Sequence, residues 1–158
     1  MKIISFDQSS RITGYAVLED KKLLGYGKFT LTDEDFGDRL NRFRKQVKKL
    51  ITEEQSVDKV LFEEIQLQQN VDTFKKLAMV YGVMMELLVE LNIPYDIVSS
   101  NTWKSKCKIK KTVRETEKQA AQRYVLENFG KKVTQDEADA ICLGYTYFNI
   151  PQDFDWSK

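Results

Sequence analysis

The order of strand-like and helix-like segments constrains the fold of this chain more than any other feature of its sequence. Period-two and short apolar patterns predict five strands, at 2–7, 13–19, 23–30, 57–63 and 95–99. Apolar residues at helical spacing predict four helices, at about 33–52, 71–91, 112–129 and 134–147. Asp20-Lys21-Lys22 predicts a hairpin turn between the second and third strands. We therefore expect an α/β fold with a mixed five-stranded sheet, a three-strand antiparallel meander plus two parallel strands, flanked by helices on both faces.

The composition fits one globular domain. The chain has 158 residues, of which 42% are hydrophobic, and only two prolines, so it can bury a substantial core. No apolar run has membrane-spanning length, and no secretory signal opens the chain. The two cysteines, Cys107 and Cys142, form no CxxC pair. We expect reduced thiols in a cytoplasmic protein and no zinc site.

The charges are unevenly distributed although the net charge is only +1. Residues 101–132 carry ten basic and three acidic side chains, a net charge of +7, and residues 133–158 carry a net charge of −4. A charge run alone usually forms a solvated face. A basic block next to an acidic one also fits a track for an anionic ligand beside a cation site.

Four carboxylates occupy positions from which they can meet. Asp7 and Glu63 each end a predicted strand, and parallel neighbouring strands place their carboxyl ends at one edge of a sheet. Asp136 and Asp139 are three residues apart, so they share one face of a predicted helix. Because the chain has no histidine, metal chemistry would depend on such oxygen ligands, which suit Mg²⁺ or Mn²⁺. Two divalent ions held there would support phosphodiester hydrolysis.

Each of these acids also has a simpler interpretation. Asp7 fits a turn residue, and Asp136 fits a first-turn acid favoured by the helix dipole. Glu63 is followed by Glu64, and alternation along a strand does not say which of them faces the site. Asp139 lies among alanines and an isoleucine, where a carboxylate is harder to explain structurally.

The predicted helix at 71–91 is more apolar than one buried face requires. From Leu77 to Leu91 only Gly82, Glu86 and Glu90 interrupt the apolar residues, so a second apolar face needs cover. A fully buried central helix is the alternative. We expect a homodimer interface formed by Phe74, Leu77, Met84, Met85 and Leu88.

Three motifs resemble those of RuvC-type Holliday junction resolvases, which belong to the ribonuclease-H-like superfamily. Residues 3–17, IISFDQSSRITGYAV, are similar to the opening motif, in which an aspartate ends the first strand and Thr-Gly begins the second. Residues 62–83 match from the glutamate through Tyr-Gly-Val without a gap, and residues 136–140, DEADA, match the terminal D-x-x-D-A. The small size and the Asp-Gln-Ser-Ser form look most like the bacteriophage branch.

The resemblance implies a crossover junction endodeoxyribonuclease, in which each protomer of a homodimer cuts one strand of a four-way DNA junction. It implies one nuclease domain over residues 1–158, located in the cytoplasm of the host cell if a phage encodes it. It favours Glu63 over Glu64. It also implies that two Mg²⁺ ions, or Mn²⁺, are bound by the catalytic residues Asp7, Glu63, Asp136 and Asp139.

The chain departs from the family pattern around this quartet. The usual Asp-Pro-Gly turn is Asp-Gln-Ser, which makes the hydroxyls of Ser9 and Ser10 candidates for phosphate binding. The position of the aromatic wedge, three residues after the catalytic glutamate, is Gln66, so Phe74 becomes the nearest stacking candidate.

The basic residues predict the DNA contacts. Lys110 and Lys111 are the candidates nearest the scissile phosphate. The further candidates are Arg11, Lys75, Lys76, Lys104, Lys106 and Lys108. More phosphate contact with less stacking predicts recognition of junction shape with relaxed sequence specificity.

Other functions remain open. A ribonuclease-H-like nuclease of flaps, forks or RNA–DNA hybrids would use the same metal chemistry. A catalytically silent junction-binding dimer is the second alternative. A sugar-kinase or actin-like ATPase needs two lobes and a second phosphate loop, for which this chain is too short.

Overall fold

The fold is built on a five-stranded sheet with the strand order β3-β2-β1-β4-β5. The computed structural model describes residues 1–151 and 154–155. The strands are β1 (Lys2–Asp7), β2 (Ile12–Glu19), β3 (Lys22–Thr30), β4 (Lys59–Glu63) and β5 (Tyr95–Val98). β1 pairs with β2 and β2 with β3 in antiparallel orientation, whereas β1–β4 and β4–β5 are parallel. The predicted meander and the two parallel strands are confirmed.

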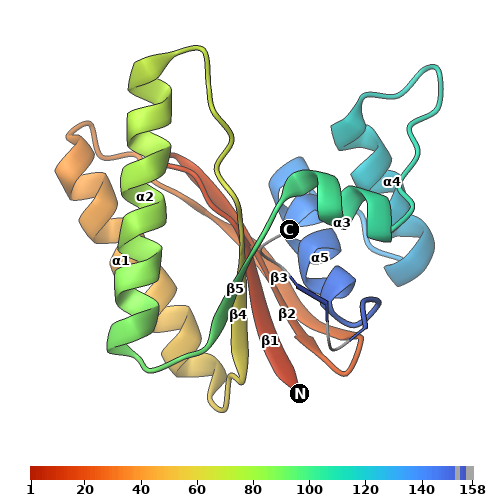
Figure 1. Ribbon diagram of the computed structural model, residues 1–158, viewed down its shortest axis with the longest axis horizontal. Helices are drawn as coiled ribbons and strands as arrows, with labels where there is room; N and C mark the ends of the chain where they lie inside the picture. The colour runs from red at the N-terminus through yellow and green to blue at the C-terminus, as the bar shows by residue number, and fades with distance from the viewer. Residues whose placement is uncertain (152–153, 156–158) are drawn as a thin grey trace.

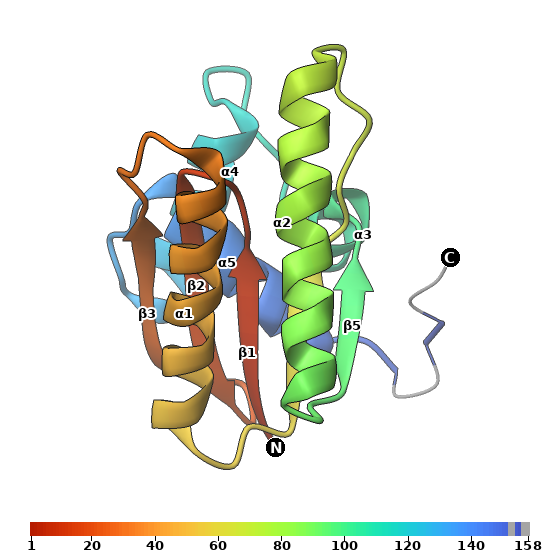
Figure 2. The ribbon, with the colours of Figure 1, turned by 90° about the vertical axis from the view of Figure 1, so that its left-hand side faces the viewer.

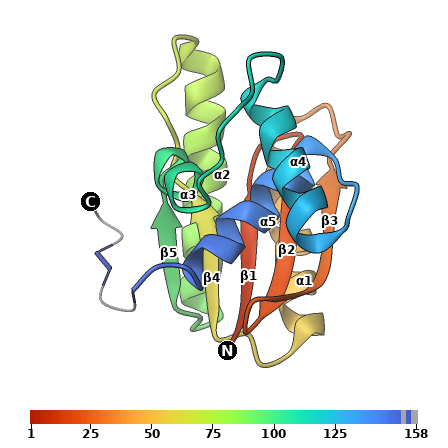
Figure 3. The same ribbon diagram turned by 90° about the vertical axis from the view of Figure 1, so that its right-hand side faces the viewer.

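Helices cover both faces of this sheet. On one face lie α1 (Phe36–Glu54) and α2 (Val71–Glu90), which Figure 2 shows in front of the strands. On the other lie α3 (Ser100–Lys106), α4 (Glu117–Phe129) and α5 (Gln135–Tyr147), seen in Figure 3. Figure 1 shows the two layers edge-on, with the sheet between them. None of the helices within the described residues is long and apolar enough to cross a membrane.

Side-chain alternation along the strands divides the core into two clusters. Ile4 and Phe6 of β1 belong to the cluster under α1 and α2, whereas Ile3 belongs to the cluster under α5. β4 alternates in the same way, with Phe62 on the α1–α2 side and Leu61 on the α5 side. The next residue of each strand therefore points to the α5 side.

The hairpin between β2 and β3 forms where it is predicted, but without glycine. Asp20 and Lys21 have φ angles of 46° and 72°. Two consecutive residues with positive φ are characteristic of the tight turns whose twist matches a β-hairpin. The Asp20 side chain also accepts a hydrogen bond of 2.8 Å from the N-terminal amine, which holds the turn against the start of β1.

The segment before α4 differs from the sequence prediction in two ways. Residues 100–106, of which 104–106 were predicted to be loop, form the short helix α3, which Ser99 caps by accepting a hydrogen bond from the Thr102 amide. The next helix begins at Glu117 and not at Thr112, because Thr116 and Gln119 form the capping box that starts α4. Its predicted end is confirmed, since Gly130 adopts a left-handed conformation with φ of 65°.

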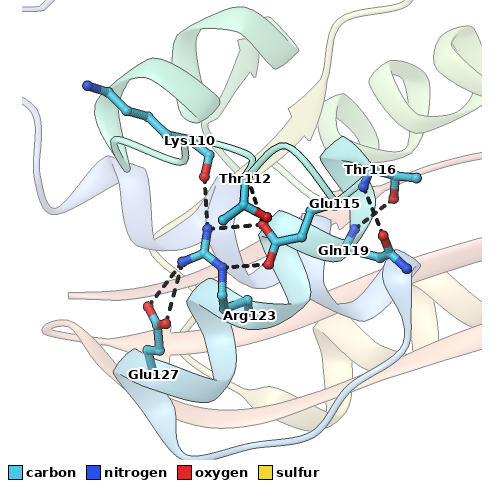
Figure 4. A network of polar contacts seen from close by, with 7 residues as sticks. All are labelled: Lys110, Thr112, Glu115, Thr116, Gln119, Arg123 and Glu127. Carbon is cyan, nitrogen blue, oxygen red and sulfur yellow. Dashed lines mark hydrogen bonds and ion pairs between the residues drawn. The ribbon is translucent and has the colours of Figure 1, made fainter.

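The sequence Thr112-Val113-Arg114-Glu115 has the capping-box pattern on which the predicted helix start at residue 112 rests. Glu115 explains why this pattern does not start a helix. Its carboxylate does accept a hydrogen bond from the Thr112 amide, but it also binds the guanidinium of Arg123 on α4 at 2.8 Å (Figure 4). Arg123 in turn donates to the carbonyl oxygen of Lys110. These contacts attach the loop to α4. The Thr112–Glu115 hydrogen bond therefore stabilises a turn of this loop and not the first turn of a helix.

Two close contacts seat α5 on the sheet. The hydroxyl of Ser5, which is fully buried in β1, donates to the carbonyl oxygen of Ala140 at 2.6 Å. At Gly14 in β2, an added Cβ would overlap the backbone carbonyl of Asp136. The first turn of α5 can therefore approach β2 so closely only because residue 14 has no side chain.

We predict that Gly14→Ala lowers the free energy of unfolding by about 1–3 kcal/mol, because α5 must move away from β2. Equilibrium denaturation in urea measures this change. Gly25→Ala in β3 is the matched control, since an added Cβ there meets nothing within 4 Å, and it should leave stability unchanged or slightly higher. Equal effects of the two substitutions would contradict this account of the α5 contact.

Candidate active site

The parallel pairing of β1 and β4 brings the first two carboxylates together. Phe6 is paired with Phe62, and Asp7 and Glu63 are the residues that follow on each strand. By the alternation described above, both side chains lie on the α5 side of the sheet. Glu64 lies one residue later and is exposed. The strand register thus agrees with the choice of Glu63 over Glu64.

Helix α5 carries the other two carboxylates. Thr134 caps the helix by accepting from the Glu137 amide, and the Glu137 side chain accepts from the Thr134 amide at 2.8 Å. This capping box makes Asp136 a first-turn residue, with its backbone against Gly14. Asp139 follows one turn later between Ala138 and Ala140, which are completely buried. The two aspartates therefore face the strand ends from a helix that is fixed to the sheet.

The electrostatics show that the four carboxylates form one cluster. Burial raises the pKa of Asp7 to about 8, with further increases from the charges of Glu63, Asp139 and Asp136. Burial raises the pKa of Glu63 to about 7, and the charge of Asp139 contributes to that rise. Burial also raises the pKa of Asp139 to about 6, with Asp136 adding to the effect. The cluster therefore favours protons or cations at neutral pH.

Two lysines supply positive charge to the cluster. The charge of Lys104, on α3, lowers the pKa values of Glu63 and Asp139, and that of Lys118, on α4, lowers those of Asp7 and Asp139. Lys118 was not among the predicted contacts, because the expected helix start placed Lys110 and Lys111 at this position. The sequence also carries the Thr116–Gln119 capping pattern, and a helix that begins there places Lys118 in its first turn. In the structure Lys110 and Lys111 are exposed in the loop between α3 and α4.

Three of the four carboxylates border a cleft of about 440 Å³. Asp7, Glu63 and Asp136 line it together with Lys118, and the loop after β4 contributes Gln66 and Gln68. A cleft lined by acids and a lysine suits a phosphate group whose charge is bridged to the acids by cations.

The four carboxylates are suitable ligands for divalent ions, although they do not form a preformed coordination site. Within residues 1–151 and 154–155, no three or more histidine, cysteine, aspartate or glutamate side chains stand close enough to form a metal-binding group. All four carboxylates nevertheless influence one another, and carboxylate oxygens are the ligands that Mg²⁺ and Mn²⁺ prefer. The side chains would have to turn toward a shared ion, which would also relieve their repulsion.

The other predicted DNA-binding residues differ in their availability. The Ser9 hydroxyl is used within its turn, where it donates to the Ile12 carbonyl and accepts from the Ile12 amide. Ser10 is half-buried. Lys76 is bound to Asp72 at 2.7 Å and Lys104 to Glu117 at 3.1 Å. The exposed basic candidates are Arg11, Lys75, Lys106, Lys108, Lys110 and Lys111.

The exposed apolar residue nearest the predicted wedge position is Leu67, in the loop after β4, and not the predicted stacking candidate Phe74. Gln66 is tied to α3, because its amide donates to the Ser100 hydroxyl at 2.5 Å. Phe74, the predicted stacking candidate, is half-buried on α2. Leu67 projects from the loop with 85% of its surface exposed. A single leucine in a polar loop follows no periodic pattern, so its exposure could not be predicted from the sequence.

The prediction that Met84 and Leu88 contact a partner chain is wrong. Met84 and Leu88 are completely buried under the sheet in a single chain, so they cannot contact a partner. Phe74, Leu77 and Met85 are half-buried. The outer surface of α2 is formed instead by residues such as Met79 and Val89, which are 50% and 70% exposed. The prediction thus mixed residues that pack on the sheet with residues, such as Met85, that border the outer surface of α2.

Comparisons with known proteins agree with this site. A model of the family "Crossover junction endodeoxyribonuclease RuvC" matches residues 3–147. The chain is 28% identical over 156 residues to crossover junction endodeoxyribonuclease RuvC of Histophilus somni, covering 93% of this chain and 79% of the relative. It is 27% identical over 162 residues to the Yersinia enterocolitica protein of the same name, covering 96% and 88%.

Solved structures show the same fold. RuvC of Thermus thermophilus in complex with a Holliday junction substrate superposes with a TM-score of 0.76 at 16% identity, covering 94% of both chains. The yeast mitochondrial Holliday junction resolvase Ydc2 gives a TM-score of 0.62 at 14% identity, covering 93% of this chain and 77% of the other.

The mixed five-stranded sheet, with acids at the ends of β1 and β4 and on α5, agrees with the expected ribonuclease-H-like fold. Within that fold class the chain belongs to the RuvC family of crossover junction endodeoxyribonucleases, whose model spans nearly all of it. The family expected from the three sequence motifs is therefore confirmed.

The raised pKa values predict how the metal-free protein responds to pH. Folded Asp7 keeps its proton up to about pH 8, whereas in the unfolded chain it loses it near pH 4. The folded state therefore binds more protons between these values, and stability falls as pH rises from about 4 to 8. In EDTA, Asp7→Asn should raise the free energy of unfolding at pH 8 by on the order of 2 kcal/mol and leave it nearly unchanged at pH 4.

Denaturation curves at the two pH values test this expectation. Glu53→Gln is the control, because Glu53 is an exposed carboxylate beside Lys49, and its effect should stay within about 0.5 kcal/mol at both pH values. If Asp7→Asn destabilised the protein at pH 8, the carboxylates would not repel one another as described.

Proposed function

We propose that this chain is a metal-dependent endonuclease that resolves four-way (Holliday) DNA junctions, and other branched DNA, by paired phosphodiester hydrolysis with relaxed sequence specificity. The observation that carries the proposal is the cluster of Asp7, Glu63, Asp136 and Asp139 inside a domain of the RuvC family, in which burial and neighbouring carboxylates raise the pKa values of Asp7, Glu63 and Asp139. A Holliday junction is the substrate bound by the Thermus thermophilus protein that shares the fold.

The four carboxylates are the proposed ligands of two Mg²⁺ ions, with Mn²⁺ as a substitute. Such ions, when bound, activate a water molecule and stabilise the leaving oxygen of the phosphodiester. The protein supplies the positions of the ligands through the ends of β1 and β4 and through α5. The ammonium group of Lys118 lines the same cleft, where it would attract the phosphate and stabilise its developing charge.

The remaining basic residues favour contact with the DNA backbone. The exposed lysines 106, 108, 110 and 111 lie on α3, which also carries Lys104, and in the loop that follows it. Phosphate contacts fix the position of a duplex without reading its sequence. Leu67, in the loop that borders the cleft, is an exposed apolar side chain that could contact unstacked bases at a branch point.

A homodimer would supply the second active site that paired cleavage needs. The outer surface of α2 and the edge strand β5 border a largely apolar groove lined by Gly82, Met85, Val89 and Tyr95, together with Glu86 and Glu90. An exposed edge strand beside an apolar helix face is a surface that proteins normally cover. The proposed twofold interface is therefore this outer face of α2.

We predict that Asp7→Asn abolishes cleavage of a labelled four-way junction in Mg²⁺, a fall of at least about a hundredfold, while junction binding is kept. The reason is that the substitution removes a metal ligand but no basic contact. Gel-shift and cleavage assays on four-way, three-way and linear DNA, with and without Mg²⁺, measure both properties. Glu64→Gln is the neighbouring control and should cut at a rate close to that of the unmodified protein.

The same assay separates the alternatives. Normal cleavage by Asp7→Asn would overturn the metal site. Preference for flaps, forks or RNA–DNA hybrids over four-way junctions would identify a different ribonuclease-H-like nuclease. Binding without cleavage by the unmodified protein would identify a silent junction-binding dimer. One strictly required cleavage sequence would contradict the relaxed specificity.

For the dimer, we predict that Val89→Lys gives a monomer that no longer makes paired cuts, because it places a charge in the apolar groove. Light scattering coupled to size-exclusion chromatography measures the oligomeric state, and a cruciform plasmid assay distinguishes nicked from linear product. Leu126→Lys, at a 45% exposed position on α4, should remain dimeric. A dimeric Val89→Lys protein would rule out this face as the interface.

A further inference from the structure

Gln8 has an unusual position for a turn residue, because its side chain is buried beside the carboxylates. It follows Asp7 directly and is only 7% exposed. Its amide nitrogen donates to the carbonyl oxygen of Glu63 at 2.6 Å, and its amide oxygen accepts from the backbone amide of Glu63 at 3.1 Å. A side chain thus satisfies both backbone groups of a proposed metal ligand.

This pair of hydrogen bonds extends the sheet beyond its backbone ladder. The last residue pair between β1 and β4 is Phe6 with Phe62. On the other side of β4 the ladder continues, since Glu63 pairs with Val98 and the Glu64 amide donates to the Val98 carbonyl. The Gln8 side chain therefore makes the hydrogen bonds to the Glu63 backbone that a further residue of β1 would otherwise make. Without it, the backbone of Glu63 would be held from one side only.

Trp103 of α3 lies near the side chain of Glu63, whereas Gln8 binds its backbone. Its side chain is 1% exposed, and within the described part of the chain its indole nitrogen is one of two buried side-chain nitrogen or oxygen atoms without a hydrogen-bond partner. The indole lies near enough to lower the pKa of Glu63, although it does not complete a hydrogen bond of normal geometry. An indole N–H can only donate, and a buried donor normally has an acceptor.

We propose that Gln8 and Trp103 are positioning residues for Glu63, Gln8 holding its backbone at the end of β4 and the indole N–H of Trp103 binding its carboxylate once that carboxylate turns toward a divalent ion. The proposal rests on the metal site proposed above. Hydrogen bonds behind a metal ligand orient it, and their loss typically weakens metal binding about 10–100-fold. Proline, which the usual family pattern has at this position, carries no side-chain amide and could not make these two hydrogen bonds.

A purely structural role would have different consequences. If Gln8 only closed the end of the sheet, its loss would reduce stability without changing the affinity for metal. If it positions Glu63, metal affinity falls, and cleavage is recovered by raising the metal concentration. Trp103→Phe separates the roles further, because phenylalanine keeps much of the buried ring packing and removes only the N–H donor.

The experiment measures binding of Mn²⁺ alone, without DNA, by isothermal titration calorimetry on the full-length protein. We expect Gln8→Ala to raise the dissociation constant about 10–100-fold and Trp103→Phe to raise it about tenfold. Asn128→Ala is the matched control, since the Asn128 amide also donates to a backbone oxygen, that of Tyr124, but on the outside of α4. Its affinity should equal that of the unmodified protein. Junction cleavage by Gln8→Ala should recover as Mn²⁺ is increased.

Unchanged Mn²⁺ affinity in folded Gln8→Ala and Trp103→Phe, with normal affinity in the unmodified protein, would overturn the positioning role and leave the metal site intact. Should Gln8→Ala fail to fold, Trp103→Phe alone decides in the same way. If the unmodified protein itself bound no Mn²⁺, the metal site would fail, and the positioning role with it.

Discussion

The parallel pairing of β1 with β4 is the constraint on which the rest of the structure depends. A parallel pair needs a crossover, and here α1 provides it between β3 and β4. The pairing aligns Phe6 with Phe62, so the residues that follow them, Asp7 and Glu63, leave the sheet at the same edge and on the same side. A shift of one residue would turn Glu63 to the α2 side and replace it with Glu64. The register of β1 and β4 therefore determines that Glu63, and not Glu64, lies beside Asp7 in the site.

That alignment is electrostatically costly, and the cost indicates function. Burial and mutual repulsion raise the pKa of Asp7 to about 8, so the ionised cluster destabilises the folded chain near neutral pH. A structural role would be served better by apolar residues. Acids that are buried together beside two lysines, in a cleft, are instead what a site for cations and phosphate requires.

The sequence was sufficient to predict those features that depend on local periodicity or on a motif. The strand order, the position of α5 and the clustering of Asp7 with Asp139 follow from alternation, capping and spacing. The start of α4 does not, because Thr112 and Thr116 both begin capping patterns and only the contact of Glu115 with Arg123 decides between them. That contact joins residues from a loop and a helix, so no local signal reveals it.

The proposed dimer face shows a related limit of prediction from sequence. In a helix as apolar as α2, composition predicts two buried faces but not which one meets the sheet. The structure assigns Met84 and Leu88 to the core and leaves Val89 outside. The angular difference between adjacent residues on a helix is large, so a choice among neighbours changes the face completely. Only the packing of α2 on β1 and β4 resolves it.

The acidic and basic halves of the site are supported differently, and this bears on specificity. The carboxylates stand on elements fixed by buried contacts, such as that of Ser5 with the Ala140 carbonyl. Most of the lysines project from α3 and from the exposed loop that Glu115 and Arg123 fasten to α4. Fixed acids keep the reacting geometry constant, whereas exposed lysines on long side chains adapt to phosphates at different positions. Under the proposed function, a site divided in this way would favour the shape of the DNA over its base sequence, because catalysis would depend on the carboxylates and docking on the lysines.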